Sequence, residues 1–397
     1  MPVIQIQEMP ALLPKLEVEH YRRPEERLFT LAERDSVTIL IGGLTWKHEE
    51  LIQAVFQSAG YRCSRLPVPS RPDFEAGKQY GNNGQCNPTY FTVGCLVRHL
   101  QQLEARGLTK REIADRFVFF SAGSCGPCRF GMYEAEYRYA LDNAGFGGFR
   151  VLIFQQGDGI HASSGHTGLT FSLDFGLNGL NALMIGDVIS DLSYRIRPFE
   201  KVSGETDRVV EHAVSRMAGL LRERGNRAGD SADAPRVRAA FRAAIGAPGR
   251  IALKIVHHLY GRDILDAIEE LRAQMDSIRV DRLRVKPVVK ITGEFWAQLT
   301  EGDGNFQIFN FHEKEGAQVI VEPISTWVAY LTRLEWTVRR ERNRSRRNRA
   351  PLRTRVSRQL EFCKEESLFS IAQVLWSRTF SRVTRRASTA GAHRTRR

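Results

Sequence analysis

The pair Cys125 and Cys128 is the strongest chemical signal in the chain, because it stands where an apolar run ends and a helical pattern begins. The run 117–120 predicts a buried strand that leads directly into the CGPC sequence. Ligands of parallel sheets collect beyond the carboxyl ends of strands, and a helix N-terminus favours the thiolate form of cysteine. Arg129 adds a positive charge beside any anionic group held there. The arrangement predicts metal-bound or redox-active thiols, with two buried thiols packed as small apolar groups as the structural alternative.

A third thiol, Cys86, lies near the end of a loop at 77–88 that is rich in glycine and asparagine and precedes a helix predicted over 89–106. Prolines just upstream predict that the whole connection is irregular. The glycines let the backbone approach a bulky object closely, and the asparagines supply hydrogen bonds. We therefore expect Cys86, Gly84 and Asn87 to contact a cluster or cofactor, unless the segment is an ordinary surface loop.

Two histidines, His161 and His166, lie in a loop after the predicted strand 150–154 and therefore on the same edge of the sheet. Histidine titrates near neutral pH, so these side chains can donate to an anionic substrate or transfer a proton. Histidines in exposed loops are also common without any such role. The sequence leaves the two interpretations evenly balanced.

Alternation of apolar strand patterns with helical patterns predicts an α/β fold. We expect two parallel-sheet Rossmann-like units with an intervening helical layer, although the sequence does not decide whether the second unit is complete. The expected segments are an irregular lead-in (1–35), a first α/β domain with the cysteine motifs (36–168), a helical region (169–283), a second α/β unit (284–330) and an Arg-rich tail that we expect to be disordered (331–397).

The net charge of +13 is confined to the end of the chain. Residues 331–397 hold 19 basic residues and five glutamates, so residues 1–330 carry a net charge of −1. A basic, low-complexity end is more often solvated than bound to nucleic acid, so we expect no nucleic-acid partner. The most apolar stretch, 171–189, contains Asp174 and Asp187, which argues against a membrane span.

Cysteine usage and the N-terminus indicate a reducing, cytoplasmic location. Six cysteines among 397 residues are far fewer than a disulfide scaffold contains. Cys63 falls in a strand pattern and Cys95 on an apolar helix face, so we expect both in the core rather than at a site. The first residues do not form a signal-peptide pattern.

Four segments together resemble a known family. They are GLTWKH at 43–48, GNNGQCNP at 81–88, GPCRFGMY at 126–133 and ITGEFW at 291–296. These segments look like the dehydratase-related module of the acyl-CoA dehydratase activase-related proteins, over about residues 35–330. That group is similar to the subunits of 2-hydroxyglutaryl-CoA dehydratase, whose α/β domains surround a cluster held by cysteines.

The resemblance implies a 4Fe-4S cluster, electron delivery by an ATP-dependent activator protein, and a hydro-lyase reaction in which water is removed from a 2-hydroxyacyl-CoA by radical chemistry. Cys86 and Cys128 fall inside matching motifs and are carried over as ligands, whereas Cys125 is added from its spacing alone. The ATP-hydrolysing module itself is not recognisable here. Association with copies of the chain or with other chains stays open.

Two other functions compete with this interpretation. A strand followed by CGPC and a helix is also the thioredoxin arrangement, so Cys125 and Cys128 can instead form the dithiol of a thiol-disulfide oxidoreductase. The proline that such folds place opposite the dithiol has no counterpart between Pro127 and Pro198. The third possibility is a non-catalytic, cluster-bearing electron-transfer or scaffold protein.

Overall fold

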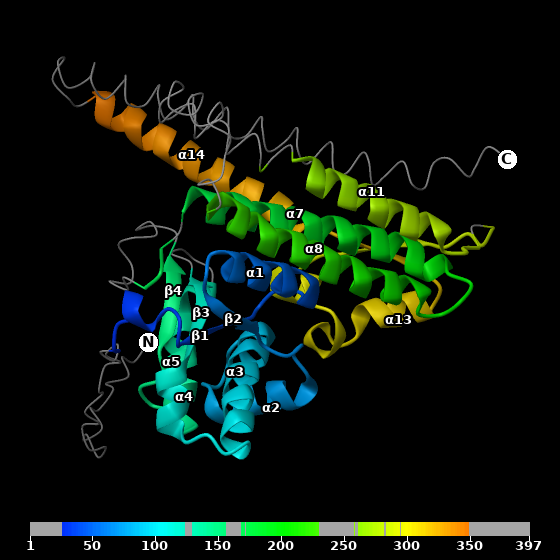
Figure 1. Ribbon diagram of the computed structural model, residues 1–397. Helices are drawn as coiled ribbons and strands as arrows, with labels where there is room; N and C mark the ends of the chain where they lie inside the picture. Colours follow the sequence, from blue (N-terminus) through cyan, green and yellow to red (C-terminus); the bar gives the residue numbers. More distant parts are fainter. Residues whose placement is uncertain are drawn as a thin grey trace, which may run out of the picture.

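Short runs of β-branched and aromatic residues in the first part of the chain form a parallel sheet with helices on both faces (Figure 1). The computed structural model describes residues 26–123, 129–155, 168–170, 172–229, 258, 261–281, 283–293 and 295–348. Within them the chain is an α/β protein, as the sequence predicts.

The first sheet has the strand order β2-β1-β3-β4, and every neighbouring pair is parallel. Leu40 of β1 lies opposite Ser64 of β2 on one side and Phe119 of β3 on the other. The four strands are β1 (Thr38–Ile41), β2 (Arg62–Arg65), β3 (Phe117–Gly123) and β4 (Val151–Gln155). The strands β3 and β4 match the predicted strands 117–120 and 150–154 to within a few residues.

Alternating side chains of these strands enter two separate cores, as parallel sheets covered on both faces require. Leu40 and Phe119 pack with α3 (Asn87–Ala105) and α5 (Tyr133–Asn143), while Ile39 and Val118 pack with Phe56 of α1 (Trp46–Ser58). One short 3₁₀ turn, η1 (Leu31–Glu33), precedes β1, and another, η2 (Arg129–Met132), leads into α5. The sheet therefore holds the N-termini of α1 and α3 beside its carboxyl edge.

Two helices, α2 (Arg71–Tyr80) and α4 (Lys110–Arg116), occupy segments that the sequence pattern did not predict as helical. Each begins with a capping box, Ser70 with Asp73 and Thr109 with Glu112, which satisfies the first free N–H groups. The proline that argued for a loop sits in the first turn of α2, where a missing N–H costs nothing. The connection between β2 and Cys86 is therefore helical over about half of its length.

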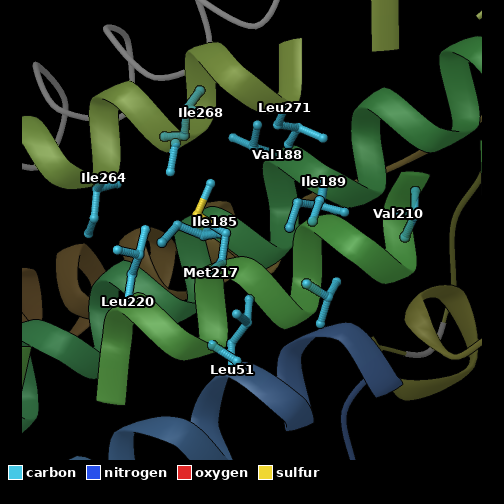
Figure 2. Packing of buried hydrophobic residues seen from close by; sticks show 14 of the residues in the cluster. Leu51, Ile185, Val188, Ile189, Val210, Met217, Leu220, Ile264, Ile268 and Leu271 are labelled. Atoms are coloured by element: carbon cyan, nitrogen blue, oxygen red, sulfur yellow. The ribbon is translucent and has the colours of Figure 1, made fainter. Parts of the chain in front are cut away.

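In the described residues the helical layer comprises α7 (Leu173–Ile196), η3 (Arg197–Phe199), α8 (Glu205–Gly229) and α11 (Arg262–Ser277). Figure 2 shows the apolar side chains of α7, α8 and α11 meeting in one cluster, with Leu51 of α1 reaching it from the side of the sheet. In the described part of the chain no helix is both long and apolar enough to cross a membrane.

The second α/β unit contributes a two-stranded parallel sheet in the described residues. Its elements are β5 (Val288–Ile291), α12 (Phe295–Leu299), η5 (Gly302–Asn305), α13 (Ile308–Lys314), β6 (Gln318–Val321) and α14 (Ile324–Asn348). Figure 1 shows α14 running alongside α7 and continuing past it. The expected tail boundary at 331 thus falls inside a helix, because the helix started by apolar residues continues through the first arginines; residues 349–397 lie outside the description.

Candidate functional site

The candidate site lies where the strand order of the first sheet changes direction. From β1 the chain moves outward to β2 and then crosses to β3 on the other side of β1, so the loops after β1 and β3 diverge. In open parallel sheets, ligands bind in the crevice at such a switch point. Gly42 follows β1, and β3 ends at Gly123, directly before the segment that contains Cys125 and Cys128. That segment, 124–128, lies outside the described residues.

Cys86 is the N-cap residue of α3, and its side chain is half-buried. Its Sγ atom lies 3.1 Å from Thr89 Oγ1 and 3.4 Å from Tyr133 Oη. Free N–H groups and the helix dipole give the start of the 19-residue α3 a positive potential, which attracts an anionic group. Tyr133 follows Cys128 by five residues, so Cys86 contacts the chain just after the CGPC segment.

Two helices hold the loop before Cys86 in place. The Tyr90 hydroxyl on α3 accepts from the Gln85 N–H at 3.0 Å and donates to the Asn82 carbonyl at 3.1 Å. The buried Glu136 carboxylate on α5 accepts from the Asn82 N–H at 2.5 Å and from Asn82 Nδ2 at 3.0 Å. Gly84 has a φ of 75°, a conformation that glycine adopts without strain. The loop is therefore built by specific contacts.

One glycine of this segment has a different role from the one the sequence suggested. Gly77 lies inside α2, and a Cβ atom built there would be 1.9 Å from the Tyr90 carbonyl oxygen. A Cβ atom on Gly94 of α3 would be 1.8 Å from the Asp73 carbonyl oxygen. The two glycines let α2 and α3 cross in contact, rather than admitting a ligand.

The other predicted site residues are placed only in part. Asn87 is the first residue of α3 and is exposed, while Arg129 begins η2 and its side chain lies outside the description. Cys125, Cys128, His161 and His166 also lie outside the described residues. Of the predicted site, the structure brings together the Cys86 loop and the chain that follows Cys128.

Cys63 and Cys95 are buried in the apolar cores on the two faces of the sheet. Burial raises the pKa of both thiols, and nearby carboxylates add to the rise at Cys95. The Cys95 thiol donates to the Pro67 carbonyl at 3.4 Å. These positions disfavour the thiolate that a metal ligand needs.

A second polar group at the same sheet edge was missed by sequence reasoning. The buried His48 ring contacts Thr45 Oγ1 through Nδ1 at 2.7 Å and Asp187 Oδ1 through Nε2 at 3.3 Å. Asp187 also accepts from the N–H groups of Ile324 and Ser325 at the start of α14, at 2.8 and 2.7 Å. The group joins α1, α7 and α14.

Around this group lies a small pocket of about 20 Å³, enough for about one water molecule. Its lining includes Thr45, His48, Asp187, Ser190 and Glu322. The signals in the sequence were a Thr and a His three residues apart after Gly42-Gly43, and an Asp inside an apolar helix. Neither indicates a partner more than 130 residues away, which only the fold supplies.

A partly buried ion pair lies beside it. Lys47 of α1, only 2% exposed, forms a short hydrogen-bonded ion pair with Glu301, whose Oε1 also accepts from the Tyr194 hydroxyl at 2.6 Å. Burial alone would raise the pKa of Glu301, but the charge and hydrogen bond of Lys47 and the hydrogen bond of Tyr194 hold it at about 2. The Glu301 carboxylate therefore stays ionised near neutral pH, and its contact with Lys47 joins the first unit to the second.

We expect the stability of the protein to lose much of its pH dependence near neutrality in Glu49→Gln. Glu49 is buried at the start of α1, where its Oε1 accepts from the N–H groups of Gly43 and Leu44. Burial raises the pKa of Glu49 from 4.5 to about 8, although these hydrogen bonds lower it in part. The folded chain therefore holds this proton more tightly than the unfolded chain. Stability falls as pH rises from about 4.5 to about 8, by up to about 1.4 kcal/mol per pH unit.

Glutamine keeps an oxygen acceptor for both N–H groups and has no proton to lose. The measurement is urea unfolding at several pH values. Between about pH 5 and pH 8, the free energy of unfolding of the Glu49→Gln variant should rise steadily relative to that of the wild type. A difference that stays constant over this range would show that Glu49 titrates normally in the fold.

Within the described residues, no group of three or more His, Cys, Asp or Glu side chains could hold a metal ion. This statement does not cover Cys125 and Cys128, which lie outside the described residues. Comparison with known proteins found no matching family model, no matching curated protein and no matching solved structure. Any proposal of function therefore rests on the resemblance of the sequence segments and on the geometry around Cys86.

Proposed function

We propose that the chain is an iron–sulfur protein whose 4Fe-4S cluster is held by Cys86, Cys125 and Cys128. The observation that carries this proposal is the contact between Cys86 Sγ and Tyr133 Oη, which joins the start of α3 to the residues that follow the CGPC segment. The CGPC segment follows β3, one of the two strands that flank the switch point of the sheet, where parallel α/β folds bind ligands.

The described residues fit such a group. Iron–sulfur clusters are anionic and are held by cysteine thiolates, which hydrogen-bond donors and positive potential stabilise. Cys86 has two hydroxyl neighbours and lies at a helix N-terminus, whereas Cys63 and Cys95 lie in apolar cores. Among the described cysteines, Cys86 therefore has the environment of a ligand.

The reaction that we propose, because the resemblance of the four sequence segments implies it, is the dehydration of a 2-hydroxyacyl-CoA thioester with electrons supplied by an ATP-hydrolysing partner protein. A bound cluster supplies one-electron transfer to such a substrate. Gly84 and Asn87 stand exposed beside Cys86, where backbone and amide groups can contact the cluster or the thioester. We place the protein in the cytoplasm and regard its second α/β unit as a further Rossmann-like unit.

The substrate class can be tested separately from the cluster. The reconstituted protein is incubated without oxygen with a reductant, ATP, an activator protein of this type and a series of 2-hydroxyacyl-CoA thioesters. We expect formation of an enoyl-CoA, detected by mass spectrometry, and no product without ATP. A loaded cluster that converts none of the thioesters would favour an electron-transfer or scaffold role instead.

We expect no catalysed reduction of disulfides. If Cys125 and Cys128 are cluster ligands, they are not available as an exchangeable dithiol at equilibrium. The measurement is reduction of insulin disulfides by dithiothreitol, with and without the protein. Strong catalysis that needs both cysteines would reverse the assignment in favour of a thiol-disulfide oxidoreductase.

A further inference from the structure

We propose that Tyr133 and Thr89 are positioning residues whose hydroxyl groups donate to the Cys86 sulfur and raise the reduction potential of the cluster; this inference rests on the proposed function. The two hydroxyl oxygens lie 3.4 and 3.1 Å from Cys86 Sγ. They come from the first residue of α5 and the first turn of α3, so two separate elements converge on one sulfur atom.

Burial fixes both donors. Thr89 is 1% and Tyr133 6% exposed, and the Tyr133 ring packs in the core between the sheet and α3. Cys86 itself packs against the edge of that core. The contact is therefore set by the packing of the helices rather than by mobile surface side chains.

The direction of donation follows from the chemistry of sulfur. A thiolate that binds iron carries no proton, so it can only accept hydrogen bonds, and each neighbouring hydroxyl must donate. Donation places a partial positive charge beside the sulfur. Reduction adds negative charge to the cluster and its ligands, so the reduced state gains more from these donors than the oxidised state does. Removing a donor should make the cluster harder to reduce.

The test compares Tyr133→Phe and Thr89→Val with the wild type. Both changes remove a hydroxyl group while keeping the ring or the branched shape that packs in the core. Tyr137→Phe is the matched control, because Tyr137 is a buried tyrosine one turn further along α5 and has no hydrogen bond to Cys86 among the contacts of that thiol. All four proteins are reconstituted without oxygen and titrated against potential by electron paramagnetic resonance.

We expect wild-type iron content in the three variants and a lower potential in Tyr133→Phe and Thr89→Val. At a fixed ambient potential, the ratio of reduced to oxidised cluster should fall by roughly threefold or more for each lost donor and stay unchanged in Tyr137→Phe. If Tyr133→Phe binds no iron, the inference is tested by the reduction potential of the cluster in Thr89→Val. A loaded variant with the wild-type potential overturns the inference, whereas a wild type that binds no iron overturns the proposed function itself.

Discussion

Cys86→Ser is expected to abolish the visible absorbance and the iron content of the reconstituted protein while the fold persists. Serine is a poor ligand for iron in a cluster, and the site has few other thiols to replace Cys86. We expect the same loss in Cys128→Ser and a weakened or altered spectrum in Cys125→Ser. The α/β core does not need a metal for stability at this chain length, so the far-ultraviolet circular dichroism should stay native.

Matched controls come from the two buried thiols. Cys63→Ser and Cys95→Ser should keep the full iron content and the native spectrum, because both thiols are buried inside apolar cores, whereas Cys86 is half-buried at the edge of one of them. Their small loss of stability should appear only in urea unfolding. If Cys86→Ser keeps its iron, the ligand set is wrong, and the loop 81–86 has to be reassigned to substrate contact or to structure alone.

Lys47→Met is expected to lower the free energy of unfolding at neutral pH by about 3 kcal/mol, because it leaves the carboxylate of Glu301, which is only 20% exposed, without its cation. Glu301 would keep only the Tyr194 hydroxyl as a described side-chain donor. In the wild type, the pKa of Glu301 is lowered from 4.5 to about 2, so its contribution to stability is present above about pH 4.5 and is lost as pH falls through about 2. In the variant this loss should begin at a higher pH.

The control is the double variant Lys47→Met and Glu301→Gln. Glutamine keeps an oxygen acceptor for the Tyr194 hydroxyl and removes the unpaired charge, so the double variant should recover at least half of the lost stability. Urea unfolding at pH 7 and near pH 4 measures both effects. A change below about 1 kcal/mol in Lys47→Met would show that the pair behaves like an exposed ion pair.

The first α/β domain could be predicted well because its signals are local. The run Ser36 to Ile41, the strand before the CGPC segment and the intervening helices follow periodicity and glycine turns. The helix α2 could not be predicted in this way, because its prolines dominated the pattern. The local signal that indicates a helix start there, despite the prolines, is the capping box formed by Ser70 and Asp73.

The candidate site could likewise be predicted only where its signals are local. Cys86 stands out in the sequence because glycines surround it and a helix follows. The contact of its sulfur with Tyr133, and the pairing of His48 with Asp187, depend on how distant elements pack. Gly186 shows the reason: a Cβ atom there would be 2.4 Å from the His48 ring, so a glycine within α7 admits the imidazole. No periodicity in the sequence predicts that approach.

The most direct test of the central claim is anaerobic purification and reconstitution, followed by iron and sulfide analysis and by electron paramagnetic resonance before and after reduction with dithionite. We predict about four iron and four sulfide ions per chain, and a signal of the reduced cluster that is absent from Cys86→Ser. Iron that stays well below one ion per chain after reconstitution would contradict the assignment of this chain as an iron–sulfur protein.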